Sequence, residues 1–321
     1  MRTSASSSVL GTSLVRPTSA VTAPPTARTS ASCWATGRPD GRWHAPYDVG
    51  MPTTAHHVAP DAVARAFARC RASGRSAVLP FVTAGYPNLA STALLLPRLA
   101  AACGSIIEVG IPFSDPIADG PVIAESMHEA LLAGCTPAGV FQTVRAVRAQ
   151  VDAALIAMVS VSIVDRMGVE RFTRDAAAAG FDGLIVPDID IEDAPALRAA
   201  CDAAGITCTL LVSPTSSDAR IARITALCSG FVYALARVGI TGERSESPDI
   251  APLIARIRAT TSLPIAAGFG ISTAAHVRAV TAHADGAIVG SAIVRSMREA
   301  ITAKRSPEDA AVALVESLTQ R

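Results

Sequence analysis

From Asp61 onward, short apolar runs alternate along the chain with longer segments rich in Ala, Leu and Arg. The apolar runs are five or six residues long and rich in Val, Ile and Ala, which is typical of strands buried on both faces of a parallel sheet. The longer segments have the length of helices. This pattern predicts strands at 78–83, 105–109, 154–159, 183–187, 207–212, 231–235, 263–267 and 285–289, with helices between them such as 89–102, 169–179, 194–203, 219–228 and 274–281.

Eight strands that alternate with helices predict an α/β fold, the (β/α)8 TIM barrel, in which a closed parallel sheet lies inside a ring of helices. An open doubly wound sheet is the alternative. It is disfavoured because no glycine-rich dinucleotide fingerprint follows the first strand. Two helical stretches, 124–132 and 137–151, stand between the second and third strands, so this unit of the barrel is expected to carry an extra helix.

Residues 1–58 have a different composition, rich in Ser, Thr, Ala, Pro and Arg and without hydrophobic periodicity. Such a segment cannot bury enough apolar surface to fold, so we expect a disordered extension at 1–58 and the barrel at 59–321. Arg-rich, Ser-rich and acid-poor composition also suits a transit peptide, which would direct the protein to a plastid. We interpret the segment as an extension upstream of a start at Met51 in a cytoplasmic protein, because the rest of the chain also uses Arg in place of Lys.

Charge and composition exclude several classes of function. The net charge of +1 gives no nucleic-acid footprint, and no apolar run reaches the roughly 18 residues that a membrane span needs. The seven cysteines form no CxxC pair, which indicates reduced thiols without a zinc site. The chain has a single lysine, Lys304, in a polar stretch after the last strand, which argues against Schiff-base and pyridoxal phosphate chemistry. We therefore expect no cofactor and no metal.

An acidic residue inside an apolar run is the first candidate for catalysis. Glu108 closes the second predicted strand, and side chains at the carboxyl ends of barrel strands face the site. We expect its carboxyl group to face the barrel mouth and to act as a general acid and base, with its pKa raised by the apolar neighbours Ile107 and Val109. The alternative is a structural carboxylate paired with an arginine.

The loop after this strand presents two further acids, Asp115 and Asp119. We expect Asp119 to accept a hydrogen bond from the substrate, with an N-cap for the helix at 124–132 as the alternative. Asp115 is expected to structure the loop or to contact a partner.

Two late glycine-rich turns suit an anion. Gly268–Ser272 follows the seventh strand and Gly290–Ser291 follows the eighth, and both open onto helices whose free N–H groups can bind phosphate. In the absence of a nearby lysine, binding would use backbone amides and the Ser291 hydroxyl. The polar segment 239–245 after the sixth strand is expected to be a mobile lid or an ordinary solvated loop.

Four acids follow the fourth predicted strand at positions 188, 190, 192 and 193. They could bind a divalent metal. We interpret them instead as groups that cap the next helix and complement the positive end of its dipole.

Five segments, in the same order along the chain, resemble the signatures of the tryptophan synthase α-subunit family. The similarity extends from about Asp61 to the C-terminus, and the five segments are 80–87, 107–121, 239–242, 268–272 and 290–294. The resemblance implies a (β/α)8 barrel that cleaves indole-3-glycerol phosphate to indole and glyceraldehyde 3-phosphate in tryptophan biosynthesis, without cofactor or metal. This agrees with the lysine argument.

The resemblance also implies roles for individual residues. Glu108 would protonate C3 of the indole ring and accept the proton of the glycerol hydroxyl, and Asp119 would bind the indole N–H. Thr241 resembles a lid threonine that orients Asp119. The expected pocket aromatics are Phe81, Tyr233 and Phe269, and the expected phosphate-binding residues are Gly242, Gly270, Gly290 and Ser291.

Two segments depart from the family pattern. Ser160–Ile163 stands where a Tyr-x-Asn-Pro sequence is usual, and Asp190 replaces the proline of an Asp-Leu-Pro sequence. These loops face the β-subunit of the α2β2 complex in the family, so the departures weaken that expectation. The alternatives are an α-subunit with a β partner, a stand-alone lyase that releases free indole for secondary metabolism, a non-catalytic regulator of a β-like partner, and another phosphate-binding barrel such as an isomerase.

Overall fold

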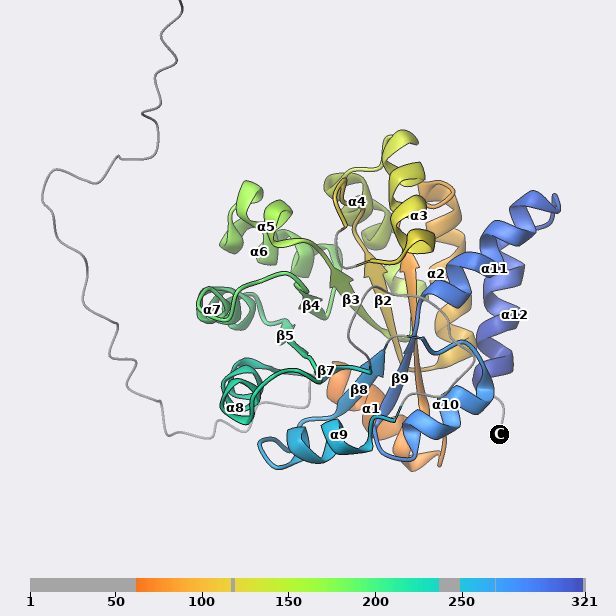
Figure 1. The fold of residues 1–321 in the computed structure, drawn as a ribbon. Coiled ribbons are helices and arrows are strands. Elements are labelled where there is room, and N and C mark those ends of the chain that lie inside the picture. Colours follow the sequence, from red (N-terminus) through yellow and green to blue (C-terminus); the bar gives the residue numbers. More distant parts are fainter. Residues whose placement is uncertain (1–61, 117–118, 237–248, 269, 320–321) are drawn as a thin grey trace, which may run out of the picture. The chain divides into compact units, whose positions relative to one another are not determined.

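The computed structural model describes residues 62–116, 119–236, 249–268 and 270–319. The predicted extension at 1–58 lies outside them, so the domain boundary stays a prediction. The described strands pair in parallel in the order β5-β4-β3-β2-β1-β9-β8-β7-β6 (Figure 1). The two ends of this order, β5 (Thr207–Thr209) and β6 (Leu211–Val212), are separated in sequence only by Leu210. The sheet therefore closes on itself, and the predicted (β/α)8 barrel is confirmed.

Each predicted strand is present, although 207–212 is divided into the two segments β5 and β6. The remaining strands are β1 (Ala77–Thr83), β2 (Ile106–Gly110), β3 (Ala154–Met158), β4 (Gly183–Ile185), β7 (Val232–Leu235), β8 (Ile265–Gly268) and β9 (Gly286–Val289).

The helices surround the barrel and include more than one per strand. They are α1 (Ala62–Ala72), α2 (Leu89–Cys103), α3 (Pro121–Leu132), α4 (Pro137–Val147, extended by a 3-10 turn at Arg148–Gln150), α5 (Val161–Met167), α6 (Val169–Ala179), α7 (Ala194–Ala204), α8 (Asp218–Leu227), α9 (Ala251–Arg258), α10 (Ala274–Thr281), α11 (Ser291–Thr302) and α12 (Pro307–Thr319). The predicted extra helix after the second strand is α3. In the described ranges, no helix is both long enough and apolar enough to cross a bilayer.

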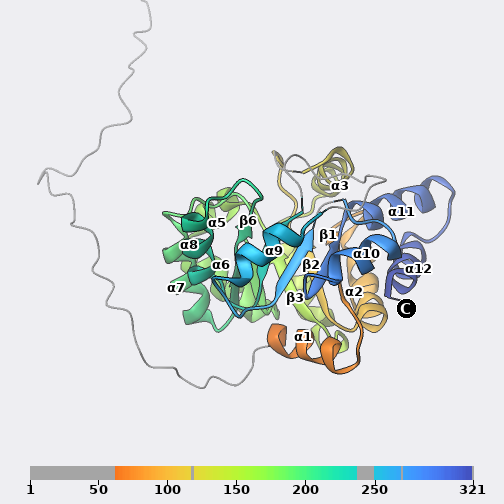
Figure 2. The ribbon, with the colours of Figure 1, turned by 60° about the horizontal axis from the view of Figure 1, so that its bottom comes forward.

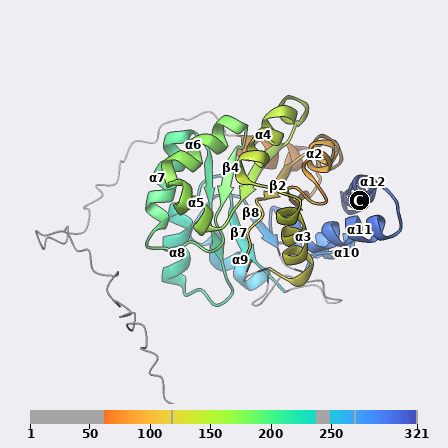
Figure 3. The ribbon, with the colours of Figure 1, turned by 90° about the horizontal axis from the view of Figure 1, so that it is seen from above.

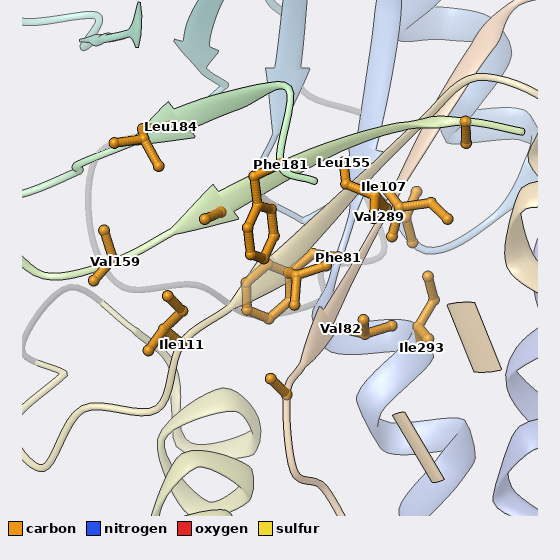
Figure 4. Close-up of a cluster of buried hydrophobic side chains, with 14 of the residues drawn as sticks. Phe81, Val82, Ile107, Ile111, Leu155, Val159, Phe181, Leu184, Val289 and Ile293 are labelled. Atoms are coloured by element: carbon orange, nitrogen blue, oxygen red, sulfur yellow. The ribbon is translucent and has the colours of Figure 1, made fainter. Parts of the chain in front are cut away.

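Alternate residues of each strand face different layers of the core. In β2, Ile107 and Val109 belong to the outer layer between sheet and helices, whereas Ile106 belongs to the inner layer. Figure 4 shows this outer layer, with Ile107 beside Leu155 of β3 and Val289 of β9. Glu108 shares the face of Ile106, so its side chain points into the barrel.

Helix α1 closes the amino-terminal end of the barrel. Val63, Ala66 and Phe67 pack into the inner apolar layer, and the Phe67 ring lies 5.8 Å from the ring of Phe231. Figure 2 shows α1 beneath the strands. The floor of the barrel is therefore apolar.

Candidate active site

Glu108 is a fully buried carboxyl group in the interior of the barrel. It lies in the middle of β2, in register with Phe81 of β1 and Ile156 of β3. Neither carboxyl oxygen has a hydrogen-bond partner among the described residues. Burial raises the pKa of Glu108 well above its ordinary value. Burial therefore favours the protonated form of this side chain, which is the form that can donate a proton.

Two expectations about Glu108 need correction. The strand does not end at this residue but continues to Gly110, so the carboxyl group lies one layer below the end of the strand. Ile107 and Val109 face the helices, so they do not contact it. Its apolar surroundings come instead from the inner layer, which includes Ile106 and Ile156. The alternative role, a structural carboxylate paired with an arginine, is not supported, because no arginine among the described residues forms an ion pair with Glu108.

Asp119 lies in the loop between β2 and α3 and is half-buried. Its backbone N–H donates to the carbonyl of Pro116 at 3.0 Å. Burial, and then the negative charge of Asp188, raise the pKa of Asp119 to about 6. The N-cap alternative is wrong, because Gly120 occupies the cap position of α3 and Pro121 its first turn.

Tyr233 on β7 is buried and lies within the electrostatic influence of both acids. Burial, and then the charges of Glu108 and Asp119, raise the pKa of its phenol. The ring needs the glycine on the next strand, since a Cβ at Gly268 would lie 2.2 Å from the Tyr233 hydroxyl oxygen. The fold therefore brings together two acids and an aromatic ring that stand 125 positions apart in the chain, from 108 to 233.

Phe81 on β1 is in register with Glu108, and its ring lies between the ends of the two neighbouring strands, β2 and β9. A Cβ at Gly110 would lie 2.5 Å from its Cζ atom, and a Cβ at Gly290 would lie 3.3 Å from its Cδ1 atom. The ring therefore spans from the end of the strand that carries Glu108 to the start of α11. A second predicted pocket aromatic thus lies in the same interior.

At the start of α11, the N–H groups of Ile293 and Val294 both donate to the carbonyl of Gly290, at 2.9 and 3.1 Å. Gly290 is its N-cap residue, makes no side-chain cap, and is followed directly by Ser291. At the start of α10, the Thr273 side chain accepts from the His276 N–H at 3.2 Å. Gly270, in the turn before α10, has a φ of +79°, which favours glycine. Both predicted phosphate turns therefore lie at helix N-termini, where the first two N–H groups have no acceptor within the helix.

Three predicted site residues, Thr241, Gly242 and Phe269, lie outside the described residues. The proposed lid at 239–245 lies there as well.

Two of the four acids after β4, Asp188 and Asp193, do not cap the next helix through their side chains as predicted. Asp188 caps the preceding helix α5, because its carboxylate accepts from the Ser160 hydroxyl at 2.7 Å and from the Val161 N–H at 2.8 Å. Asp193 is the N-cap residue of α7, but its side chain makes no cap hydrogen bond. Throughout the described ranges, no three His, Cys, Asp or Glu side chains gather as a metal site requires. Sequence reasoning missed the influence of Asp188 on Asp119. The available signal in the sequence was Ser160, because a serine directly before a helix often takes part in hydrogen bonds at the helix N-terminus.

Comparison with known proteins gives consistent matches. A family model described as tryptophan synthase alpha chain matches residues 67–321. The tryptophan synthase alpha chain of Roseiflexus sp. (strain RS-1) is 43% identical over 240 residues, which are 74% of this chain and 92% of that protein. The alpha chain of Acidothermus cellulolyticus is 44% identical over 240 residues, 74% of this chain and 90% of that protein.

Solved structures agree in fold. A structure of Mycobacterium tuberculosis tryptophan synthase has a TM-score of 0.74 and 33% identity, and the match covers 81% of this chain and 97% of that one. The alpha subunit from Legionella pneumophila str. Paris has a TM-score of 0.73 and 31% identity over 81% of this chain and 97% of that one.

Proposed function

The chain belongs to the tryptophan synthase alpha chain family, and we propose that it is a carbon–carbon lyase that cleaves indole-3-glycerol phosphate into indole and glyceraldehyde 3-phosphate, in tryptophan biosynthesis. One observation carries the proposal. A buried carboxyl group with a raised pKa, Glu108, lies inside the barrel and has no hydrogen-bond partner among the described residues, and both its charge and that of a second acid, Asp119, act on Tyr233. An acid that donates a proton and an acid that accepts a hydrogen bond are what this reaction requires.

In the proposed mechanism, Glu108 donates its proton to C3 of the indole ring. Positive charge develops on the ring nitrogen, and the carboxylate of Asp119 accepts the N–H and stabilises that charge. The bond between C3 and the glycerol carbon then breaks, and its electron pair restores the aromatic ring. The hydroxyl on that carbon returns its proton to Glu108 and becomes the aldehyde. The substrate itself is the electron sink, so no lysine is needed.

We assign the rest of the site to binding. Phe81, Tyr233 and Phe269 would enclose the indole ring, and Thr241 would orient Asp119. The phosphate would lie at the start of α11, held by backbone N–H groups and the Ser291 hydroxyl, with further contacts from Gly242 and Gly270. The close approach of the Phe81 ring to Gly290 supports a phosphate end next to this aromatic side chain.

We further propose that residues 59–321 form the catalytic domain of a cytoplasmic protein that associates with a tryptophan synthase β-subunit. A stand-alone lyase is the second candidate, favoured by one contact. In the departing segment, the Ser160 hydroxyl donates within the chain, to Asp188 at 2.7 Å. Turnover of indole-3-glycerol phosphate measured with and without added β-subunit separates the two, since only an α-subunit should be strongly stimulated.

The same assay tests the chemistry. Glu108→Gln and Asp119→Asn should each strongly reduce the rate of indole formation. For Glu108→Gln the reduction should be at least about a thousandfold, because both proton transfers are lost. Asp115→Asn, assayed without β-subunit, is the matched control, because it removes an exposed acid from the same loop. Indole formation by Glu108→Gln at the wild-type rate would refute the role assigned to Glu108. If the wild-type chain forms no indole with or without β-subunit, the proposed function is refuted and a chain that regulates without catalysis remains.

A further inference from the structure

Helices α3 and α11 lie side by side on the outside of the barrel and are joined by one arginine (Figure 3). The Arg298 guanidinium of α11 forms ion pairs with Glu125 and, at 2.9 Å, with Glu129 of α3. It also donates a hydrogen bond to the hydroxyl of Tyr86, a buried residue in the turn after β1. A single side chain thus connects three elements of the barrel wall.

Both helices begin at the proposed site. Helix α11 starts at Ser291, the proposed phosphate end, and Arg298 follows seven residues later, or roughly 10 Å along the helix. Helix α3 starts at Pro121, two residues after Asp119, and Glu125 is four residues further, or roughly 6 Å. The ion pairs therefore join the two helices within about two turns of the residues that would contact the two ends of the substrate.

A separate contact fixes α3 to the sheet. The hydroxyls of Ser126 and Thr83 are hydrogen-bonded at 2.7 Å, and both residues are buried. This contact holds α3 against β1 but does not involve α11. Arg298, in contrast, reaches α3 from α11, and both of its ion-pair partners lie on α3.

We propose that Arg298 is a positioning residue that sets the distance between the phosphate-binding end of the site and Asp119. The inference rests on the proposed function, because it requires a ligand that contacts both ends at once. A rigid ligand that spans two binding groups is sensitive to their separation, and a displacement of about 1 Å is costly. Exposed ion pairs add little stability, so the contribution of Arg298 should appear in this separation rather than in folding.

The test compares three probes on the full chain. They are indole, inorganic phosphate, and an indole joined to a phosphate by a three-carbon chain. Arg298→Met should lower the affinity for the linked probe about five- to tenfold, whereas its affinities for indole alone and for phosphate alone should stay within about twofold of wild type. Arg98→Met is the matched control. It breaks an exposed ion pair of 2.7 Å between α2 and α12, which should leave all three affinities unchanged.

A charge exchange supplies the rescue. Arg298→Glu alone should lower the affinity for the linked probe at least as much as Arg298→Met does. The double variant Arg298→Glu, Glu129→Arg moves the cation to α3, where it can pair with Glu125 and with the carboxylate introduced on α11. This exchange should return the affinity to within about twofold of wild type. If Arg298→Met does not fold, the double variant decides alone.

Three results would overturn the inference. One is an unchanged affinity of Arg298→Met for the linked probe. Another is an equal loss for the linked and the separate probes, which would mean a general loss of structure. A third is failure of the charge exchange to restore binding. If the wild-type chain does not bind the linked probe at all, the proposed function fails and the inference fails with it.

Discussion

Replacing Glu108 with Gln should stabilise the folded chain increasingly as the pH rises. The wild-type carboxyl group is fully buried, has no hydrogen-bond partner among the described residues, and has a raised pKa. Glutamine has nearly the same shape but cannot ionise. The substitution therefore removes a proton-linked cost and changes little else in packing.

The magnitude follows from proton linkage. Above the ordinary value of 4.5 the unfolded chain has lost the Glu108 proton, whereas the folded chain retains it until its raised pKa is reached. The unfolded state then binds fewer protons, so the free energy of unfolding of the wild type falls as pH rises, by about 1.4 kcal/mol per pH unit. The fall ends at the folded pKa, and below pH 4.5 this group makes no pH-dependent contribution.

Urea unfolding of both proteins from about pH 4 to about pH 8 measures this difference. The difference in free energy between Glu108→Gln and wild type should be constant at the acid end and then grow with the stated slope. Asp115→Asn, which changes an exposed acid, should give a curve parallel to wild type. Parallel curves for Glu108→Gln and wild type would show that Glu108 ionises normally in the folded chain, which would refute the argument that the barrel keeps it neutral.

Two further predictions concern activity and packing. Because the pKa of Asp119 is about 6, kcat/KM should fall as the pH drops below about 6, where the protonated acid no longer accepts the indole N–H; a steady-state pH profile that stays flat to pH 5 would contradict this. Gly268→Ala should raise KM and lower the unfolding temperature more than Gly290→Ala does. The added methyl lies 2.2 Å from the Tyr233 hydroxyl oxygen in the first variant and 3.3 Å from a Phe81 ring carbon in the second. Equal effects of the two variants in substrate titration and thermal unfolding would count against this prediction.

The fold could be predicted from the sequence because strands buried on both faces are continuous apolar runs. The same property hid one detail. The run 207–212 reads as one strand, but it changes neighbours at Leu210, pairing with β4 before it and with β7 after it. Hydrophobicity reports that a residue is buried but not which strand it pairs with, so the division was not visible.

The site was predictable only where the signal was local. Glu108 could be recognised because a carboxylate in an apolar run is costly without a purpose. Which apolar residues surround it depends on the alternation of faces and on neighbouring strands. Asp188 and Asp119 are 69 positions apart, and Arg298 and Glu125 are 173 positions apart. No periodicity in the chain encodes contacts over such separations.

The apolar plug that α1 inserts beneath the strands has a consequence for hydrogen isotopes. Val63, Ala66 and Phe67 pack into the inner apolar layer at this end, so we expect the Glu108 carboxyl hydrogen to exchange with water through the opposite end of the barrel. Whatever covers that end during turnover also isolates the hydrogen from bulk water. A deuteron taken from one substrate hydroxyl could then be delivered to the ring carbon of the next molecule, so a barrel closed at its base can retain an isotopic label from one cycle to the next.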